Sequence, residues 1–319
     1  MHKLLPTFCF LLVALSALRG QDEAIFNHYV QNPIILNPGA AGFAEEYTVF
    51  LNARAQWSGF EDSPKTIALR ANGPVGQSFG IGAALFSESA AQQNRLKGQL
   101  DVAFRFGLGR EVRGKQPFQA AFGFFTQIQR LTLDPDIINN PNYEPGDLDL
   151  MAYLDGRNQF DAGVGIYGSH EAGAFGGFTI NNLVLNRLND ISGRTTDEGF
   201  NFTFLLGQRF NVEELNVNLT PSVMIRDVQG APFMMDFNLQ AGFLEDQFIA
   251  GLSYRYLGAV GILLGTKLNG FQLYYNFDLG FGGFQQYNSG SHEFTVGYSI
   301  SRGSIQEAQR RNAAEDKLR

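Results

Sequence analysis

The sequence predicts an all-β protein, a transmembrane antiparallel β-barrel of about fourteen strands of the outer-membrane type. Between about Glu46 and Arg302, apolar and polar residues alternate with a period of two, in segments of roughly ten residues. A stretch with the character of an export signal precedes this region. The longest uninterrupted apolar stretch after that signal, Leu257–Gly265, is far shorter than the roughly 20 residues of a membrane-spanning helix. We therefore expect the chain to cross a membrane with strands.

The composition fits such a wall. The chain has 30 Phe and 37 Gly, both above ordinary usage, and phenylalanine suits a lipid-facing surface while glycine suits tight turns and close approach between strands. The mean hydropathy of -0.12 is that of a soluble protein, but a barrel holds its apolar residues in alternation and not in runs. The net charge of -7 and the absence of a basic patch interleaved with aromatic residues argue against a nucleic-acid partner.

Residues 1–20 are predicted to be a signal peptide. Lys3 supplies positive charge, an apolar stretch runs from Leu4 to Leu15, and cleavage is expected after Ala17 or Gly20. Cleavage would also remove Cys9, the one cysteine of the chain. An exported protein without disulfides needs another means of holding itself together, and a closed hydrogen-bonded barrel supplies one.

Residues 21–45 form the next predicted element, a periplasmic N-terminal arm or partial plug. The segment is rich in Asn, Pro and Gly and has no sustained period. Two Asn-Pro pairs, together with Gly39 and Gly42, predict successive turns that fold the arm back at the periplasmic mouth of the barrel.

The barrel itself is predicted over residues 46–302. In its first strand Tyr47, Val49 and Leu51 would face lipid, whereas Asn52 and Arg54 would face the lumen. The fourteen strands are expected near residues 47–57, 65–73, 78–88, 96–108, 118–130, 158–168, 172–182, 199–211, 215–226, 233–243, 247–257, 259–268, 270–281 and 292–302.

The connectors between these strands predict an orientation. With both termini in the periplasm, periplasmic turns should be short and outer loops longer. The turns expected to be short are 73–77, 109–116, 169–171, 211–214, 244–246 and 269–270, the last an Asn-Gly pair that favours a two-residue hairpin. The outer set is 58–64, 89–94, 131–157, 183–198 and 282–291, and the connector at 257–258 breaks the trend. Residues 303–319 would be a charged periplasmic tail, either a short helix or disordered, with or without a partner.

Charged residues on the inward face leave two interpretations open. They are Arg54, Arg70, Asp101, Arg105, Asp161, Asp236, Arg255, Lys267 and Asp278. Charges of mixed sign argue against a strongly ion-selective channel. They fit both a water-filled pore and a lumen braced by internal ion pairs.

The long outer loop Leu131–Arg157 is the candidate cargo-facing surface, with Asp134, Asp136, Glu144, Asp147 and Asp149 as its acidic residues. Oxygen-rich surface loops can hold calcium, but this spacing matches no calcium-loop pattern. Docking of a surface protein is the alternative use. No histidine spacing predicts a metal site, and no cofactor is expected.

Catalysis is not expected. Ser169, His170 and Glu171 place suitable residue types together, but as neighbours in a tight turn their side chains should diverge. A third possible function is that of an outer-membrane hydrolase. Lipase activity that is lost on His170→Ala would support it.

The most specific local pattern surrounds the arm. An aromatic-x-x-Tyr pattern (Phe26 to Tyr29) precedes Asn-Pro, followed by an Asn-Pro-Gly-Ala-Ala-Gly run, an Arg-x-Gln-Trp strand end and a Pro-x-Thr. These motifs resemble those of the PorP/SprF family, outer-membrane proteins of the type IX secretion system in Bacteroidetes. The matching positions are Tyr29, Asn32, Pro33, Asn37, Pro38, Gly39, Ala40, Gly42, Arg54, Gln56, Trp57, Pro64 and Thr66. Many members have Gln where this chain has His28, and Ala where it has Gly39.

The resemblance implies a non-enzymatic accessory or anchoring role in the outer membrane. Such proteins assist export or surface attachment of a secreted cargo through its C-terminal domain, some for gliding-motility adhesins, and others work with periplasmic components of the system. Loops 131–157 and 183–198 would grip the cargo, while the arm and tail would face the machinery. The alternative function is a passive or substrate-selective outer-membrane pore.

Overall fold

The computed structural model describes residues 25–60, 62–110, 116–139, 146–184, 201–228, 231, 233–256, 258–281 and 288–307. Its strands are β1 (Glu46–Ala55), β2 (Lys65–Val75), β3 (Phe79–Ala90), β4 (Gln93–Leu108), β5 (Phe118–Leu133), β6 (Arg157–His170), β7 (Ala174–Asn181), β8 (Asn201–Gln208), β9 (Phe210–Val212), β10 (Val217–Asp227), β11 (Met234–Phe243), β12 (Phe248–Arg255), β13 (Ala259–Leu268), β14 (Phe271–Gly280) and β15 (Ser291–Ser301).

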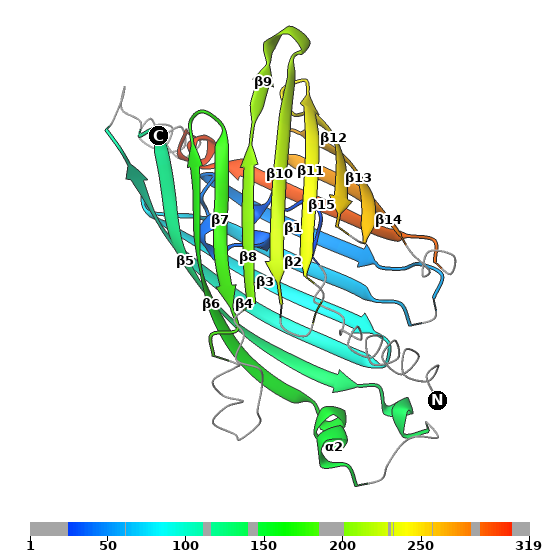
Figure 1. The fold of residues 1–319 in the computed structure, drawn as a ribbon. Coiled ribbons are helices and arrows are strands. Elements are labelled where there is room, and N and C mark those ends of the chain that lie inside the picture. Colours follow the sequence, from blue (N-terminus) through cyan, green and yellow to red (C-terminus); the bar gives the residue numbers. More distant parts are fainter. Residues whose placement is uncertain are drawn as a thin grey trace, which may run out of the picture.

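The strands form one closed antiparallel barrel (Figure 1). Apart from β8 and β9, which both pair with β10, each strand pairs with its neighbours in the chain, and β1 pairs with β15 from Glu46↔Ser301 to Ala55↔His292. The short β9 continues the line of β8, because both pair with β10. The described part of the chain therefore confirms the predicted barrel of fourteen strands.

The interruption between β8 and β9 has a visible cause. Gln208 would lie opposite Pro221, which has no N–H to donate to a ladder. The next amide, Arg209 N–H, points to the other side of the strand and donates to the carbonyl of Gly173, which precedes β7, at 2.9 Å. The strand predicted as continuous over 199–211 is thus two segments, and residues 199–200 lie outside the described part of the chain.

Strand β1 ends earlier than predicted. Pairing stops at Ala55, and Gln56 N–H donates to Pro64 O at 2.9 Å across the connector. Trp57 adopts a positive φ of 50°, which extended strands do not contain. The predicted strand 47–57 therefore includes two residues of the turn.

The connectors separate by length at the two ends of the barrel. One end, called here the short-turn end, carries the turn at Asn269–Gly270. Both turn residues have positive φ, and Leu268 pairs with Phe271. This is the two-residue hairpin that the sequence predicted. The other, the long-connector end, carries residues 134–156, with a 3-10 helix Pro135–Asn139 and helix α2 (Leu148–Asp155). The predicted longer connector 89–94 is wrong: β3 and β4 extend until only Ala91 and Gln92 remain between them, with Ala91 at φ 51°.

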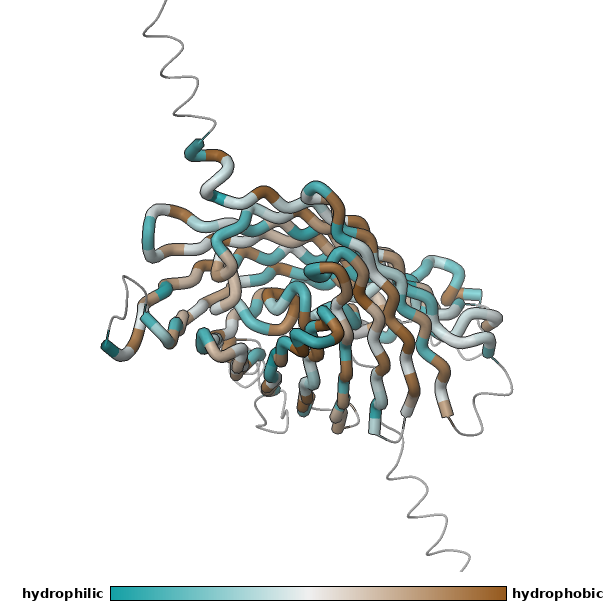
Figure 2. The backbone as a smooth tube through the Cα atoms, turned by 90° about the horizontal axis from the view of Figure 1, so that it is seen from above, coloured by the Kyte–Doolittle hydropathy of each residue, from teal (hydrophilic) through white to brown (hydrophobic). Residues whose placement is uncertain are grey.

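The two faces of the wall differ as the alternation predicted. Along β4, Leu96, Leu100 and Val102 are exposed on the outside, whereas Lys97 and Asp101 between them are buried inside. Figure 2 shows the same alternation of apolar and polar colour along the strands. Seven of the predicted inward charges are buried in the lumen: Arg54, Arg70, Asp101, Arg105, Asp161, Asp236 and Asp278. Arg255 and Lys267 also line the lumen and are partly buried.

Among the described residues, none of the helices has the length and apolar character needed to cross a membrane. Residues 302–307, at the start of the predicted tail, are helical, and residues 308–319 lie outside the described part of the chain.

Candidate functional site

The N-terminal arm, residues 25–45, lies inside the ring of strands (Figures 1 and 2). Phe26, Tyr29 and Ile34 are at most 2% exposed, because side chains from opposite walls surround them. The two Asn-Pro pairs begin two 3-10 turns, Pro33–Ile35 and Pro38–Ala40, with proline at the first position of each, where no amide donor is needed. The arm thus occupies the space that an open channel would use.

The arm extends along the lumen from one end of the barrel to the other. At the short-turn end, Arg302 N–H donates to Glu45 O at 3.0 Å. Toward the long-connector end, Ile25 lines a cavity together with Gln129 of β5 and Val228, which follows β10. The two Asn-Pro pairs predicted successive turns at the periplasmic mouth, in an arm or partial plug, and in the structure these turns lie within the barrel.

Glycines on the inward face make room for the arm. A Cβ atom added to Gly80 of β3 would lie 1.9 Å from Ala41 O, and one added to Gly123 of β5 would lie 2.1 Å from Gly39 N. Both distances are far below van der Waals contact, so only glycine permits this approach of backbone to backbone. The high glycine content indicated close approach between strands, but not that the arm is the approaching segment.

Asn37 fixes the second turn to the wall. Its side-chain Oδ1 accepts the Gly39 amide at 2.8 Å, which caps the turn. Its Nδ2 donates to Ile166 O of β6 at 2.9 Å and to Phe178 O of β7 at 3.2 Å. The Asn37 side chain therefore forms hydrogen bonds with the turn and with the barrel wall at the same time.

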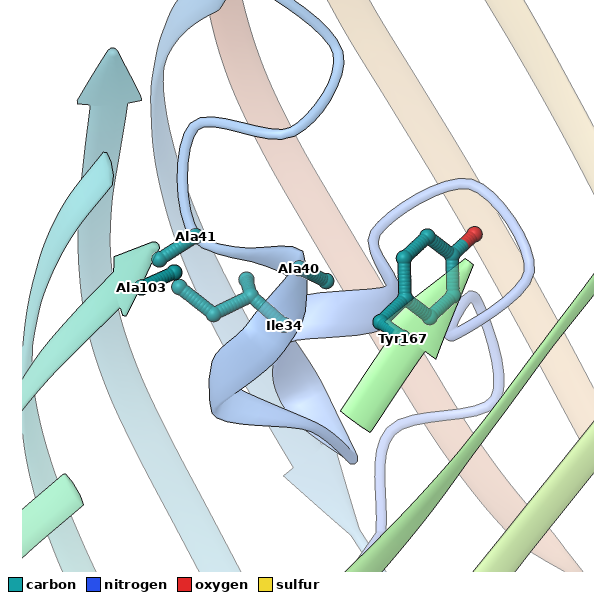
Figure 3. Close-up of a cluster of buried hydrophobic side chains, with 5 residues drawn as sticks. All are labelled: Ile34, Ala40, Ala41, Ala103 and Tyr167. Carbon is teal, nitrogen blue, oxygen red and sulfur yellow. The ribbon is translucent and has the colours of Figure 1, made fainter. Parts of the chain in front are cut away.

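A small apolar cluster covers the same region (Figure 3). Ile34, Ala40 and Ala41 of the arm lie against Ala103 of β4 and Tyr167 of β6. Phe43 adds an edge-to-face contact with the Tyr167 ring, with 4.9 Å between ring centroids. The cluster joins the arm to two separate strands.

The first half of the arm contacts a set of buried polar side chains, called here the lumenal polar cluster: Asn27, His28, Asn52, Arg54, Asp278 and Glu293. The amide of Asn27 donates to both carboxylate oxygens of Glu293, at 3.0 and 3.1 Å. His28 Nδ1 lies 3.1 Å from Glu293 Oε1, and Asn52 Nδ2 lies 3.2 Å from His28 Nε2. Because an amide nitrogen only donates, Nε2 accepts and the imidazole proton on Nδ1 is donated to Glu293.

Arg54 connects the two carboxylates of this cluster. Its NH1 donates to Glu293 Oε2 at 2.7 Å and its NH2 to Asp278 Oδ2 at 2.9 Å. Asn27 Nδ2 donates to the same Asp278 oxygen at 2.8 Å. The arm is therefore held by ionised side chains from β1, β14 and β15, in a setting where charge-assisted bonds are strong.

A second ion pair lies beside the cluster. Arg255 of β12 contacts Asp236 of β11 in bidentate fashion, at 2.8 and 2.9 Å, and its NH2 donates to Asn27 Oδ1 at 3.4 Å. Asn238 Nδ2 donates to the hydroxyl oxygen of Tyr29. Burial raises the pKa of the Tyr29 phenol, so this side chain stays protonated and contributes no charge.

Near the short-turn end, Arg105 of β4 binds the last residues of the arm. Its guanidinium donates to the carbonyls of Gly42 and Phe43, at 3.3 and 3.0 Å, and pairs with Glu45 at 2.5 Å. Arg302 NH1 also donates to Gly76 O in the β2–β3 turn. Together these contacts fix the passage from the arm to β1.

The other motif positions have different surroundings. Asn32 is buried at the start of the first turn but makes no side-chain cap, and the backbone of Gly42 lies against that of Gly73. Trp57 N–H donates to Ser291 Oγ at 3.1 Å, and Pro64 O accepts from Gln56 N–H. Thr66 is buried on the inward face of β2. The structure thus brings the arm residues and Arg54 together, while Gln56, Trp57 and Pro64 lie in the β1–β2 connector.

The sequence did not predict that Glu293, Asn27 and Asn52 belong to one cluster. Glu293 lies within the predicted last strand, in phase with inward-facing Thr295, and that phase was the available indication. The carboxylate partners of Asn27, Asp278 and Glu293, are 251 and 266 residues away along the chain, and no local pattern reports such contacts.

The predicted cargo-facing residues belong to the long-connector end. Asp147 is exposed and its Oδ1 accepts Leu150 N–H at 3.2 Å, which caps the start of α2, while Asp134 Oδ1 accepts the Asp136 amide at 3.0 Å. Glu144 lies outside the described residues, and Asp149 lies in α2. Among residues the structure describes, no group of three or more His, Cys, Asp or Glu side chains could hold a metal ion.

The second long connector begins at a buried carboxylate. Asp161 of β6 accepts the backbone amides of Asn182 and Val184 at 3.1 and 3.2 Å. Residues 185–200, which include most of the predicted loop 183–198, lie outside the described part of the chain.

His170 and Ser169 lie at the short-turn end of β6. The Nδ1 of His170 accepts the Ala172 amide at 3.1 Å, which engages this nitrogen within the turn. The ring is exposed and serves the local turn geometry.

Two lumenal cavities of about 290 Å³ each flank the arm. The first, called here the basic cavity, opens toward the long-connector end and is lined by Ile25, Phe26 and residues 34–38 of the arm. The second lies toward the short-turn end and is lined by Val30, Gln31, His170 and Lys267, among others. The two cavities share no lining residue.

Comparison with known proteins places the chain among membrane proteins of secretion. The sequence model of the family described as "Type IX secretion system membrane protein PorP/SprF" matches residues 18–298. No curated protein matches the chain.

Among solved structures, the chain is similar to the toluene transporter TbuX of Ralstonia pickettii, with 8% identity and a TM-score of 0.48 over 90% of this chain and 97% of that chain. It is similar to the toluene transporter TodX of P. putida, with 9% identity and a TM-score of 0.48 over 85% and 94%. It is also similar to the outer membrane protein Omp33 of Acinetobacter baumannii, with 5% identity and a TM-score of 0.43 over 81% and 99%.

Proposed function

We propose that this chain, which belongs to the PorP/SprF family of type IX secretion system membrane proteins, assists the export or surface attachment of a cargo protein by binding it. It does so as an outer-membrane barrel whose lumen is closed by its own arm. Its partners are a secreted or surface cargo, through the cargo's C-terminal domain, and periplasmic components of the system.

The observation that carries this proposal is the arm inside the lumen. A pore requires a continuous water-filled path. Here the backbone amide of Asn27 donates to Glu293 and its side chain donates to Asp278, while the side chain of Asn37 donates to β6 and β7. The cavities above and below have no lining residue in common. These features favour a braced, filled barrel that presents binding surfaces at its two ends.

The long-connector end offers the cargo surface in this proposal. Between β5 and β6, the described residues 134–139 and 146–156 carry a 3-10 helix and α2, and Asp161 binds the start of the second long connector. In the orientation predicted from connector lengths, both face the outside of the cell. The short-turn end and the tail would face the periplasmic machinery.

A cargo-display experiment tests the proposal. Deleting the gene should remove one or a few proteins from the cell surface, measured by surface proteomics, and the full chain supplied in trans should restore them. A variant with residues 134–156 replaced by a short turn should insert as a barrel yet fail to restore them. Unchanged display of every surface protein in the deletion strain would refute the proposal.

The alternative, a passive or substrate-selective pore, makes a different prediction. The purified wild-type barrel would conduct steadily in a planar bilayer, and cargo display would not depend on residues 134–156.

A further inference from the structure

The lipid-facing wall carries an apolar hollow across strands β2 to β6, called here the outward hollow. Its volume is about 650 Å³. The smallest residues that line it on the outward face are Ala71, Ala83 and Gly98, which leave space between larger neighbours. Those neighbours are exposed on the outside of the barrel: Leu69, Leu85, Leu100, Ile128 and Phe160. The outward hollow can therefore hold acyl chains, which gain by contact with apolar surface.

The strand register places two cations next to this hollow, toward the long-connector end. Arg130 of β5 is two residues beyond Ile128 on the same face, and Lys65 of β2 is four residues before Leu69. Both cations are exposed. The Arg130 guanidinium donates to Asp155 O at 2.9 Å and has further N–H donors. In the described part of the chain neither cation forms an ion pair. The apolar surface thus ends at two positive charges.

An apolar hollow with positive charge at one end has the chemistry of an anionic lipid site. Lysine and arginine near a membrane surface attract anionic headgroups, and arginine N–H groups match phosphate oxygens. Strands β2 and β5 are three strand spacings apart, about 14 Å, so one headgroup can contact both long side chains. We infer that the outward hollow binds a membrane lipid with a phosphate headgroup, its acyl chains on the small residues and its phosphate at Lys65 and Arg130. This function is separate from the proposed cargo role.

A second copy of the chain fits the same face less well. A symmetric contact between two copies would bring this face onto itself. Along β2 to β6 no outward-facing residue is acidic, so Lys65 and Arg130 would find no carboxylate on the other copy. An anionic lipid supplies the missing negative charge.

A second hollow on the outside of the same barrel offers an internal comparison. It spans β8 to β13, has a volume of about 870 Å³, and is lined by Leu206 and Val223 among others. The next outward row toward the long-connector end holds Phe204, Ile225 and Met235. This second hollow is therefore followed by apolar side chains where the outward hollow is followed by cations, and it should not select the charge of a headgroup.

Native mass spectrometry of the full mature chain, released from detergent micelles, tests the inference. The probes are dioleoyl phosphatidic acid and dioleoyl phosphatidylcholine, which have the same acyl chains and differ in the charge of the headgroup. We expect the wild type to bind phosphatidic acid at least about tenfold more tightly than phosphatidylcholine, because two cations contact the anionic headgroup. Equal binding of the two lipids by the wild type would overturn the inference.

Site variants establish where the lipid binds. Lys65→Gln and Arg130→Met should each weaken phosphatidic acid binding about fivefold and leave phosphatidylcholine binding unchanged. Ala83→Phe fills the outward hollow and should weaken the binding of both lipids. Val223→Phe, in the second hollow, is the matched control and should leave the preference for phosphatidic acid as it is.

The four substitutions change the outward face on different strands, and heat-modifiable electrophoretic migration checks that each variant forms a barrel. A preference for phosphatidic acid that persists in the double variant Lys65→Gln, Arg130→Met would place the lipid elsewhere and overturn the inference. A dimer of the wild type that Ala83→Phe dissociates would identify a second copy as the occupant of the hollow, which would also overturn it.

Discussion

Arg54 lies between two buried carboxylates that would otherwise repel one another. It donates to Glu293 at 2.7 Å and to Asp278 at 2.9 Å, and all three side chains are at most 7% exposed. Removing one partner of a buried ion pair leaves an uncompensated charge, which typically costs 3–5 kcal/mol. We expect Arg54→Met to lower the free energy of unfolding by about that amount, measured by urea unfolding in micelles.

Arg130→Met provides the control. Arg130 is exposed, and its guanidinium donates to Asp155 O at 2.9 Å. Its loss should change the unfolding free energy by less than about 0.5 kcal/mol. Equal effects of the two substitutions would show that the lumenal polar cluster contributes no more than a surface arginine.

His28 has a narrower requirement, one donor and one acceptor in a buried position. Its ring donates to Glu293 and accepts from Asn52, and it stacks on Tyr274 with ring centroids 5.7 Å apart. Glutamine can also donate and accept hydrogen bonds. His28→Gln should therefore cost less than about 1 kcal/mol, whereas His28→Leu leaves Glu293 without one donor and should cost about 1–3 kcal/mol.

Urea unfolding of the two His28 variants side by side measures the difference. If leucine were tolerated as well as glutamine, hydrogen bonding would not explain the polar residue at this position, and packing alone would suffice.

At the scale of elements, the arm and the barrel wall are shaped for each other. A Cβ at Gly123 would lie 2.1 Å from Gly39 N and 2.3 Å from Pro38 C, both backbone atoms. Gly123→Val should therefore destabilise the protein by about 1–3 kcal/mol or displace the arm from the lumen. Urea unfolding and chymotrypsin cleavage near Phe26 and Tyr29 distinguish these outcomes.

A double-mutant cycle tests whether contact with the arm causes the destabilisation by Gly123→Val. In a variant lacking residues 25–43, Gly123→Val should cost close to nothing, because the contact it disrupts is gone. Gly98→Val is the matched control on a neighbouring strand, since a Cβ there would meet Leu85 Cδ2 at an ordinary 3.7 Å. A cost of Gly123→Val that persists without the arm would indicate strain within the strand itself.

The strands could be predicted from sequence because their rule is local. Alternation placed Arg54, Asp101 and Asp236 on the inward face, and Asn269–Gly270 predicted its own hairpin. The tight turn at Ala91–Gln92 was missed because polar residues extend the strands there beyond the apolar pattern. The position of the arm could not be derived in this way, since a turn-rich segment has no period and its partners lie in strands hundreds of residues later.

For the whole molecule, connector lengths predict which end faces the cell exterior. The mature chain is expected to have no cysteine, so introduced cysteines can report the orientation. Asp136→Cys at the long-connector end should react with a membrane-impermeant maleimide on intact cells. Glu213→Cys, exposed at the short-turn end, should react only after the outer membrane is permeabilised. The reverse labelling pattern would show that the barrel has the opposite orientation, with residues 134–156 in the periplasm.

Conductance reports the state of the lumen as a whole. The arm is bound at both ends of its path, through Glu293 and Asp278 at one and Arg105 at the other, so thermal release of the whole segment should be rare. We therefore expect the wild-type barrel to show little current in a planar bilayer, and the variant lacking residues 25–43 to conduct steadily.

Removing the arm leaves most strand contacts intact, because each strand remains paired with two neighbours around the closed sheet. The inward face then exposes Arg54, Asp278, Glu293 and other polar side chains to water, which can fill the space that the arm occupied. Heat-modifiable migration must first show that the deletion variant still forms a barrel. Gly123→Val, which pushes against the arm without shortening the chain, should give intermediate or flickering current. If the wild type conducts as well as the deletion variant, the arm does not close the lumen, and a pore becomes the better description of the protein.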